Sequence, residues 1–197
     1  MALYIECEHL TEEEKKARHE LIYLFNPCLK AIFDKSPKFQ AYAYNSCRQT
    51  AIFSSIFLLK VLKDYHIDTY EGNFSDVIQG NKTEYEHAFA IAYNDKRKLL
   101  VDVSRTERQL LFKTTVNIVY PKVNGYEEIK LLDYKKFDFF SMFLMEEPEY
   151  ITGMRPVEVY QEAEEMYNWL KTKSKSEQIN FAYKIYSKTT KIGGEFV

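Results

Sequence analysis

Three residues in the first half of the chain have the types that acyl transfer through sulfur requires: Cys47, His87 and Asp102. In such chemistry a cysteine thiolate attacks a carbonyl carbon and an imidazole moves the proton between thiol and leaving group. A carboxylate holds the imidazole in one orientation and tautomer. We therefore predict that these three side chains form a catalytic triad.

The position of Cys47 favours a reactive thiolate. It follows Asn45-Ser46 and opens a long helical stretch, residues 48–64. A helix N-terminus offers free backbone N–H groups and a partial positive charge, and both stabilise a thiolate. A nearby imidazolium would stabilise it further.

His87 and Asp102 lie in neighbouring runs, 85–93 and 99–104, whose alternation predicts strands. The polar segment 94–98 between the two runs predicts an antiparallel hairpin. In such a hairpin Asp102 can lie opposite the first half of the partner strand. The predicted register therefore permits a contact between His87 and Asp102.

An acyl-transfer site also needs donors for the developing oxyanion. The backbone N–H of Cys47 is one candidate, and the side chain of Gln40, upstream of it, is another. Asn45 is a third candidate, although its side chain is also suited to capping the helix.

Each residue of the trio also has a non-catalytic interpretation. Cys47 can be a small core residue at a helix start, and His87 a strand histidine with its hydrogen bonds satisfied. Asp102 is less easily explained in this way, because it stands between Val101 and Val103, where a carboxylate needs a partner. Their order and contexts together favour the catalytic interpretation.

The other cysteines do not suggest a metal site. Cys28 follows Pro27 in an apolar helical run and is predicted to be core, and Cys7 is interpreted as incidental. None of the three cysteines is in a CxxC pair, so zinc is not indicated. We expect no metal and no cofactor.

The remaining pattern predicts an α+β fold. Thr11-Glu12-Glu13-Glu14 is a capping box that starts a helix to about Asp34, kinked or split by Pro27. Strands are predicted at 67–74, 85–93, 99–104, 116–120 and 129–132, and helices follow at 156–170 and 176–188. We expect a central helix bearing Cys47 to pack on an antiparallel sheet, with flanking N- and C-terminal helices. One domain would cover residues 1–197, with a catalytic core at about 40–135 and a helical C-terminal part at about 136–197.

Composition excludes some classes of function. Hydrophobic residues make up 46% of the chain and charged residues 28%, which predicts a packed core. The net charge of −2 without a basic stripe argues against nucleic acid as a partner. No apolar run approaches the roughly 20 residues of a membrane span, and the N-terminus lacks the pattern of a signal peptide. We expect a cytoplasmic protein, and the composition leaves its oligomeric state open.

These motifs resemble the transglutaminase-like core of the papain-like cysteine protease superfamily. The resemblance rests on Cys47 at a helix start, then His87-Ala88-Phe89, then Asp102-Val103-Ser104, within residues 40–106. It implies an α+β fold in which Cys47 is the nucleophile, His87 the general base and acid, and Asp102 the orienting residue. Phe89 and Val103 depart from the family pattern, in which Trp and Pro are frequent at these positions.

The expected activity is that of a cysteine peptidase, amidase or transglutaminase-like enzyme acting on a peptide or protein amide. Leader-peptide peptidases share this core and are similar in size. Arylamine N-acetyltransferases are an alternative, because Leu100-Val101-Asp102-Val103 resembles their Asp strand, but their Arg-Gly-Gly run before the cysteine is absent. The other alternative is a catalytically inactive binding domain of the same fold.

Overall fold

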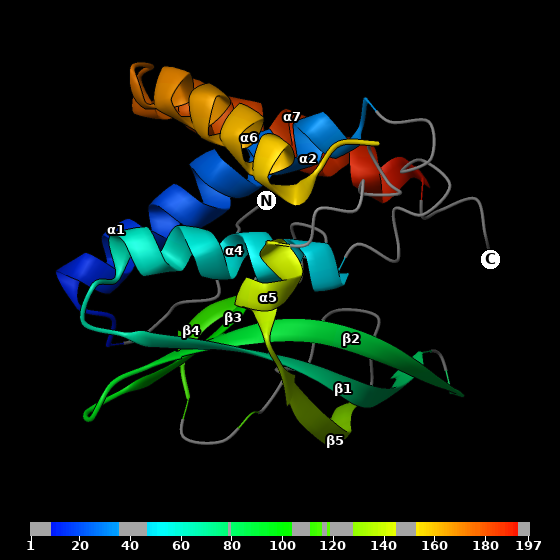
Figure 1. Cartoon of the computed structure of the whole chain (residues 1–197). Helices are drawn as coiled ribbons and strands as arrows, with labels where there is room; N and C mark the ends of the chain where they lie inside the picture. The colour runs from blue at the N-terminus through cyan, green and yellow to red at the C-terminus, as the bar shows by residue number, and fades with distance from the viewer. Residues whose placement is uncertain are drawn as a thin grey trace.

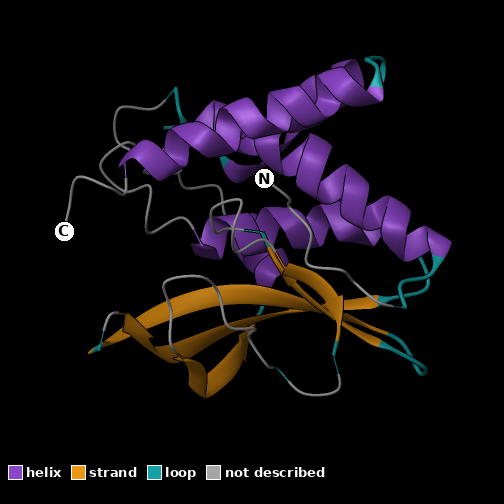
Figure 2. Cartoon of the chain, turned by 180° about the vertical axis from the view of Figure 1, so that it is seen from behind, coloured by secondary structure: helices purple, strands orange, loops and turns teal. Residues whose placement is uncertain are grey.

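The computed structural model describes residues 9–35, 47–78, 80–103, 111–115, 118, 128–144 and 153–192. In these ranges, helices cover one face of an antiparallel β-sheet, as both views show (Figures 1 and 2). The predicted α+β class is therefore confirmed, together with the helix that carries Cys47 and the helices that flank the sheet in sequence. The predicted strand 116–120 and Cys7 lie outside the described residues, apart from Ile118.

The sheet of the described residues has five strands in the order β4-β3-β2-β1-β5. All neighbours are antiparallel. The two long strands β1 and β2 form its centre, and β3 follows β2 through a tight turn in which the Asn94 N–H donates to the Arg97 carbonyl at 2.9 Å. The predicted hairpin is thus present. The strands are β1 (His66–Ile78), β2 (Asn81–Tyr93), β3 (Lys98–Asp102), β4 (Leu111–Thr114) and β5 (Glu128–Phe137).

The two faces of β2 carry side chains of different size. Ala90 and Ala92 belong to the main core on the helical side, whereas Phe89 and Ile91 belong to a smaller cluster on the other face. Side chains alternate across a strand, so the run of alanines presents a flat surface to the helices. Helix α4 (Cys47–Val61) packs against this surface, in contact with β1 and β2.

Helix α4 lies between the sheet and an outer layer of helices (Figure 1). Its residues 50–58 are buried, as expected of a helix covered on several sides. The ring of Phe57 stacks on Phe25 of the N-terminal segment, with centroids 4.5 Å apart. The outer layer contains α2 (Asn26–Phe33), α6 (Pro156–Lys171) and α7 (Lys175–Ile192).

The predicted kink at Pro27 takes the form of a π-helical segment. Helix α1 (Glu12–His19) starts at the predicted capping box, and the π-helix η1 (Glu20–Phe25) leads directly into α2. The Asn26 N–H donates to the Leu21 carbonyl, five residues back. Pro27 has no N–H to continue a regular ladder, so the wider turn lets the helix continue past it.

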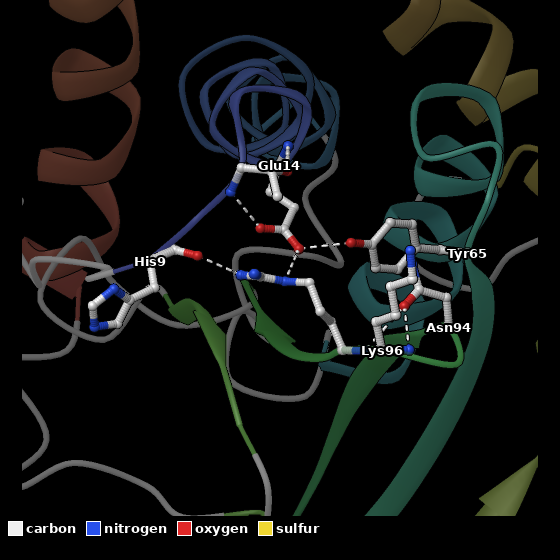
Figure 3. Close-up of polar contacts among 7 residues, drawn as sticks. His9, Glu14, Tyr65, Asn94 and Lys96 are labelled. Atoms are coloured by element: carbon white, nitrogen blue, oxygen red, sulfur yellow. Dashed lines mark hydrogen bonds and ion pairs between the residues drawn. The ribbon is translucent and has the colours of Figure 1, made fainter.

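A buried carboxylate ties helix α1 to the β2–β3 turn. Glu14 is fully buried, and its carboxylate accepts from the Thr11 N–H at 2.7 Å and from the Tyr65 hydroxyl at 2.6 Å. Arg97 pairs with the same carboxylate at 2.8 Å and also donates to the His9 carbonyl (Figure 3). Every oxygen of the buried group therefore has a partner, which offsets its desolvation.

Two described elements were not predicted. Strand β4 at one edge of the sheet is only four residues long. Helix α5 (Phe139–Phe143) is a single short turn. Asp138 caps its N-terminus, and the Asp138 side chain accepts from the Phe140 and Ser141 N–H groups. Such short elements carry too little periodicity to be recognised. No helix in the described ranges has the length and apolar character needed to cross a membrane.

Candidate active site

A buried hydrogen bond joins the two predicted partners on the hairpin. His87 Nε2 lies 2.6 Å from Asp102 Oδ2, and the two residues are 6% and 2% exposed. A carboxylate only accepts, so the Nε2–H donates to it. This arrangement fixes the tautomer and leaves Nδ1 as the nitrogen for a second partner. The strand register explains the pair, because the β2–β3 ladder ends at Ala90–Val101 and Asp102 lies just beyond it.

The thiol of Cys47 is also hydrogen-bonded with the His87 side chain. Cys47 is the first residue of α4 and is half-buried. Burial raises the pKa of its thiol, but a hydrogen bond and the charge of His87, together with the Ala88 N–H, outweigh burial and lower the pKa from its ordinary value of 9.0. The negative charge of Asp102 acts in the opposite direction. The surroundings therefore favour the thiolate.

The Ala88 contact shows how α4 reaches the sheet. The N–H groups of a strand lie in the plane of the sheet, so this donor meets the sulfur at the edge of β2. The described β2–β3 ladder ends two residues away at Ala90. The thiol thus approaches from the helical side, whereas His87 shares its strand face with Phe89 and Ile91.

An ion pair holds the first turn of α4 over the same strands. Arg48, next to Cys47, pairs with Glu71 of β1, and Glu71 lies directly opposite Ala88 in the β1–β2 register. The Glu71 carboxylate is also 3.8 Å from the Lys135 ammonium of β5. Ala88 contacts the Cys47 thiol, and Glu71 holds Arg48 of the same helix. Both contacts of α4 therefore lie at the cross-strand pair Glu71–Ala88.

The ring of His87 is enclosed by β1. Its centroid lies 5.7 Å from that of Phe74 in an edge-to-face arrangement, and its cross-strand neighbour is Gly72. A Cβ on Gly72 would lie 2.7 Å from Leu131 Cδ1 and 2.9 Å from the Asp133 carbonyl oxygen. A side chain at Gly72, directly opposite His87, would therefore crowd β5.

A polar group that the sequence analysis missed lies behind Asp102. Lys30 of α2 is 4% exposed, and the charges of Asp102 and Asp34 act on its ammonium. Asn26, one turn earlier, donates to the carbonyl of Val103 at 3.0 Å. The signal in the sequence is the four-residue spacing of Asn26, Lys30 and Asp34 in an otherwise apolar helix, which places all three on one face.

The oxyanion candidates and Cys28 are the remaining residues for which the sequence predicted a place. Gln40 and Asn45, the candidate oxyanion donors, lie outside the described residues. Cys28 is fully buried as predicted, and burial raises the pKa of its thiol to about 12. Neither Cys28 nor Cys47 is in a disulfide. In the described ranges, no cluster of three or more His, Cys, Asp or Glu side chains is arranged to hold a metal ion.

The geometry suits one type of chemistry. A thiol with a lowered pKa, an imidazole in contact with it and a carboxylate that fixes the imidazole are the components of nucleophilic catalysis through sulfur. Comparison with protein-family models, with curated proteins and with solved structures finds no match to this chain. The assignment of a function therefore rests on the residues themselves.

Proposed function

We propose that this chain is a cysteine-dependent acyl-transfer enzyme that acts on an amide of a peptide or protein. The observation that supports this most directly is the buried His87–Asp102 hydrogen bond of 2.6 Å next to a helix-start thiol whose pKa His87 lowers. The resemblance of the three motifs to the transglutaminase-like core agrees with the proposal.

The proposed reaction proceeds through a thioester. The Cys47 thiolate attacks the carbonyl carbon and forms a C–S bond, while backbone N–H groups at the start of α4, that of Cys47 among them, stabilise the developing oxyanion. The His87 imidazolium gives its Nδ1 proton to the leaving nitrogen, and the C–N bond breaks. An amide needs such an acid because an unprotonated amine leaves poorly.

The second half of the reaction releases the acyl group. Neutral His87 takes a proton from water or from an incoming amine, which attacks the thioester carbonyl. The C–S bond breaks, and the thiolate and imidazolium form again. With water the enzyme is a hydrolase, and with an amine it is a transglutaminase-like transferase. A reduced thiol is required throughout, which agrees with a cytoplasmic location.

Acyl capture by Cys47 is the first test. Incubation with p-nitrophenyl acetate, followed by acid quench and peptide mapping, should show an acetyl group on Cys47 and none on Cys28. His87→Ala should slow both labelling and release of the acetyl group by at least about a hundredfold, because it removes the acid and base. Equal labelling and release in wild type and His87→Ala would reject the proposal.

Amide cleavage or transfer is the second test. A mixture of tryptic peptides of known composition is incubated with wild type and with Cys47→Ala, and new termini or new amide links are sought by mass spectrometry. Products that require Cys47 support the proposal. If only acetyl-CoA yields an acetylated Cys47 and an acetylated amine, the acetyltransferase alternative is correct instead. A protein without either reaction is a binding domain that retains the three residues.

A further inference from the structure

The buried face of α2 carries a charge that the reaction outlined above does not use. Lys30 is 4% exposed, and no other lysine whose side chain the structure describes is buried. A lysine is almost never buried without a charged partner, because the desolvation of an ammonium is costly. Its place next to the candidate site therefore needs an explanation.

The position of Lys30 is set by α2 itself. Asn26 precedes it by one turn and anchors the helix to the end of β3 by donating to the Val103 carbonyl at 3.0 Å and to the Tyr186 hydroxyl at 2.9 Å. Residues four apart lie on one helix face, so Lys30 is presented to the same end of β3. That end of the strand is Asp102, which is 2% exposed.

We propose that Lys30 is a positioning residue of this site: its buried ammonium balances the charge of the Asp102 carboxylate and thereby favours the Cys47 thiolate. The inference rests on the proposed function. The Asp102 charge raises the pKa of the Cys47 thiol, so a cation beside Asp102 opposes that effect. In this role Lys30 acts on the nucleophile through Asp102.

The charge balance of the cluster supports this role. Burial lowers the pKa of Lys30 from 10.5 to about 8, and the charges of Asp34 and Asp102 limit this fall. The ammonium is therefore charged at neutral pH. The elements packed against α2, namely η1, α6 and α7, carry further titratable groups, among them Glu20, Tyr23, Tyr160, Glu162, Tyr167 and Tyr186. On α2 itself, Cys28 is the remaining titratable neighbour in the core.

The test compares Lys30→Met with Lys30→Arg, using the pH midpoint of Cys47 alkylation by iodoacetamide. Removal of a positive charge raises the pKa of a neighbouring acid, so Lys30→Met should raise the midpoint by about one pH unit. Lys30→Arg keeps the charge and should keep the midpoint. Lys35→Met is the matched control, since Lys35 is exposed on the same segment and pairs with Glu162 at 3.0 Å. A Lys30→Met midpoint equal to that of wild type would overturn the inference.

The same measurement separates this inference from the proposed function. If wild-type Cys47 titrates as an ordinary thiol and His87→Ala does not change it, the proposed function fails. If the wild-type midpoint is lowered and depends on His87 but not on Lys30, only the present inference fails. A purely structural role for Lys30 would change the unfolding midpoint of Lys30→Met and leave its alkylation midpoint in place.

A reciprocal measurement covers the case in which Lys30→Met does not fold. Coupling between two charges acts equally on both groups. The Asp102 charge raises the pKa of Lys30, so Asp102→Asn should lower the midpoint of the Lys30 titration, followed by NMR of lysine labelled with ¹³C at Cε and assigned with Lys30→Arg. An unchanged Lys30 midpoint in Asp102→Asn would overturn the inference.

Discussion

The two cysteines of the described residues show how strongly position decides the chemistry of a thiol. Cys28 is surrounded by apolar side chains, and burial raises its thiol pKa to about 12. Cys47 is also partly buried, yet its contacts with His87 and the Ala88 N–H lower the pKa of its thiol. Of these two thiols, only that of Cys47 therefore has surroundings that favour the thiolate.

Asp102→Asn tests the orienting carboxylate. An amide can present its NH₂ to His87 Nε2 and then favours the tautomer with the proton on Nδ1, which removes the acceptor that the thiol needs. We expect turnover of p-nitrophenyl acetate to fall by about three orders of magnitude with the fold retained. The measurement is steady-state hydrolysis alongside circular dichroism. Asp95→Asn, on the exposed β2–β3 turn, is the control, and similar turnover of Asp102→Asn and wild type would remove Asp102 from the site.

At the level of single residues the sequence predicted candidate site residues where these lie in regular elements. Cys47, His87 and Asp102 stand in a helix and two strands whose patterns are strong, and the structure brings all three together. Lys30 was not predicted because its role depends on how α2 packs across the end of β3. The spacing of Asn26, Lys30 and Asp34 places them on one helix face, but it does not show which strand that face meets.

The helices and strands around the site differ in how well they could be predicted from the local sequence. The β2–β3 hairpin could be predicted because Asn94 accepts from the Lys96 and Arg97 N–H groups, at 3.0 Å each, which is the turn chemistry that asparagine favours. The split at Pro27 was expected, but the sequence pattern did not show that it would take a π-helical form. Strand β4 is stabilised by pairing with β3, which its four residues do not reveal.

Gly72 is a position opposite His87 where the close approach of β5 leaves no room for a side chain. Gly72→Ala should destabilise the protein by about 1–3 kcal/mol, because the added Cβ would lie 2.9 Å from the Asp133 carbonyl oxygen, which belongs to the paired backbone of β5. The measurement is the urea midpoint of unfolding. Glu86→Ala is the control, since Glu86 is exposed and lies next to His87 on β2. Equal midpoints for Gly72→Ala and wild type would show that β5 can move away from this position.

At the scale of the whole molecule, tyrosines join the outer helices to the rest of the core. Tyr167 of α6 donates to Glu20 of η1 at 2.9 Å, and Tyr186 of α7 donates to the Ile22 carbonyl at 2.7 Å. Tyr160 is 4% exposed, but its hydroxyl has no hydrogen-bond partner among the described residues. Burial raises the pKa of all three phenols above their ordinary value of 10.0.

The raised pKa values of these buried phenols predict the alkaline pH at which the protein unfolds. A group whose pKa is higher in the folded state contributes stability that is present below its unfolded pKa and lost as pH rises above it. Burial also raises the pKa of Tyr65 to about 12, so stability should decline above pH 10.0. Burial lowers the pKa of Lys30 from 10.5 to about 8, so the contribution of Lys30 to stability rises with pH between these two values. Unfolding followed by circular dichroism should therefore coincide with the rise of phenolate absorbance.

Tyr160→Phe and Tyr167→Phe form the pair of variants that tests this account. Tyr160→Phe removes a buried hydroxyl without a described partner, so it should stabilise the protein or leave its stability unchanged at neutral pH, and should raise the pH of alkaline unfolding. Tyr167→Phe also removes a buried phenol, but it takes a donor from Glu20 and should cost about 1 kcal/mol at neutral pH. Urea unfolding at neutral pH and an alkaline titration measure the two effects. If both variants unfold at the wild-type pH, the buried phenols do not set the alkaline limit of this fold.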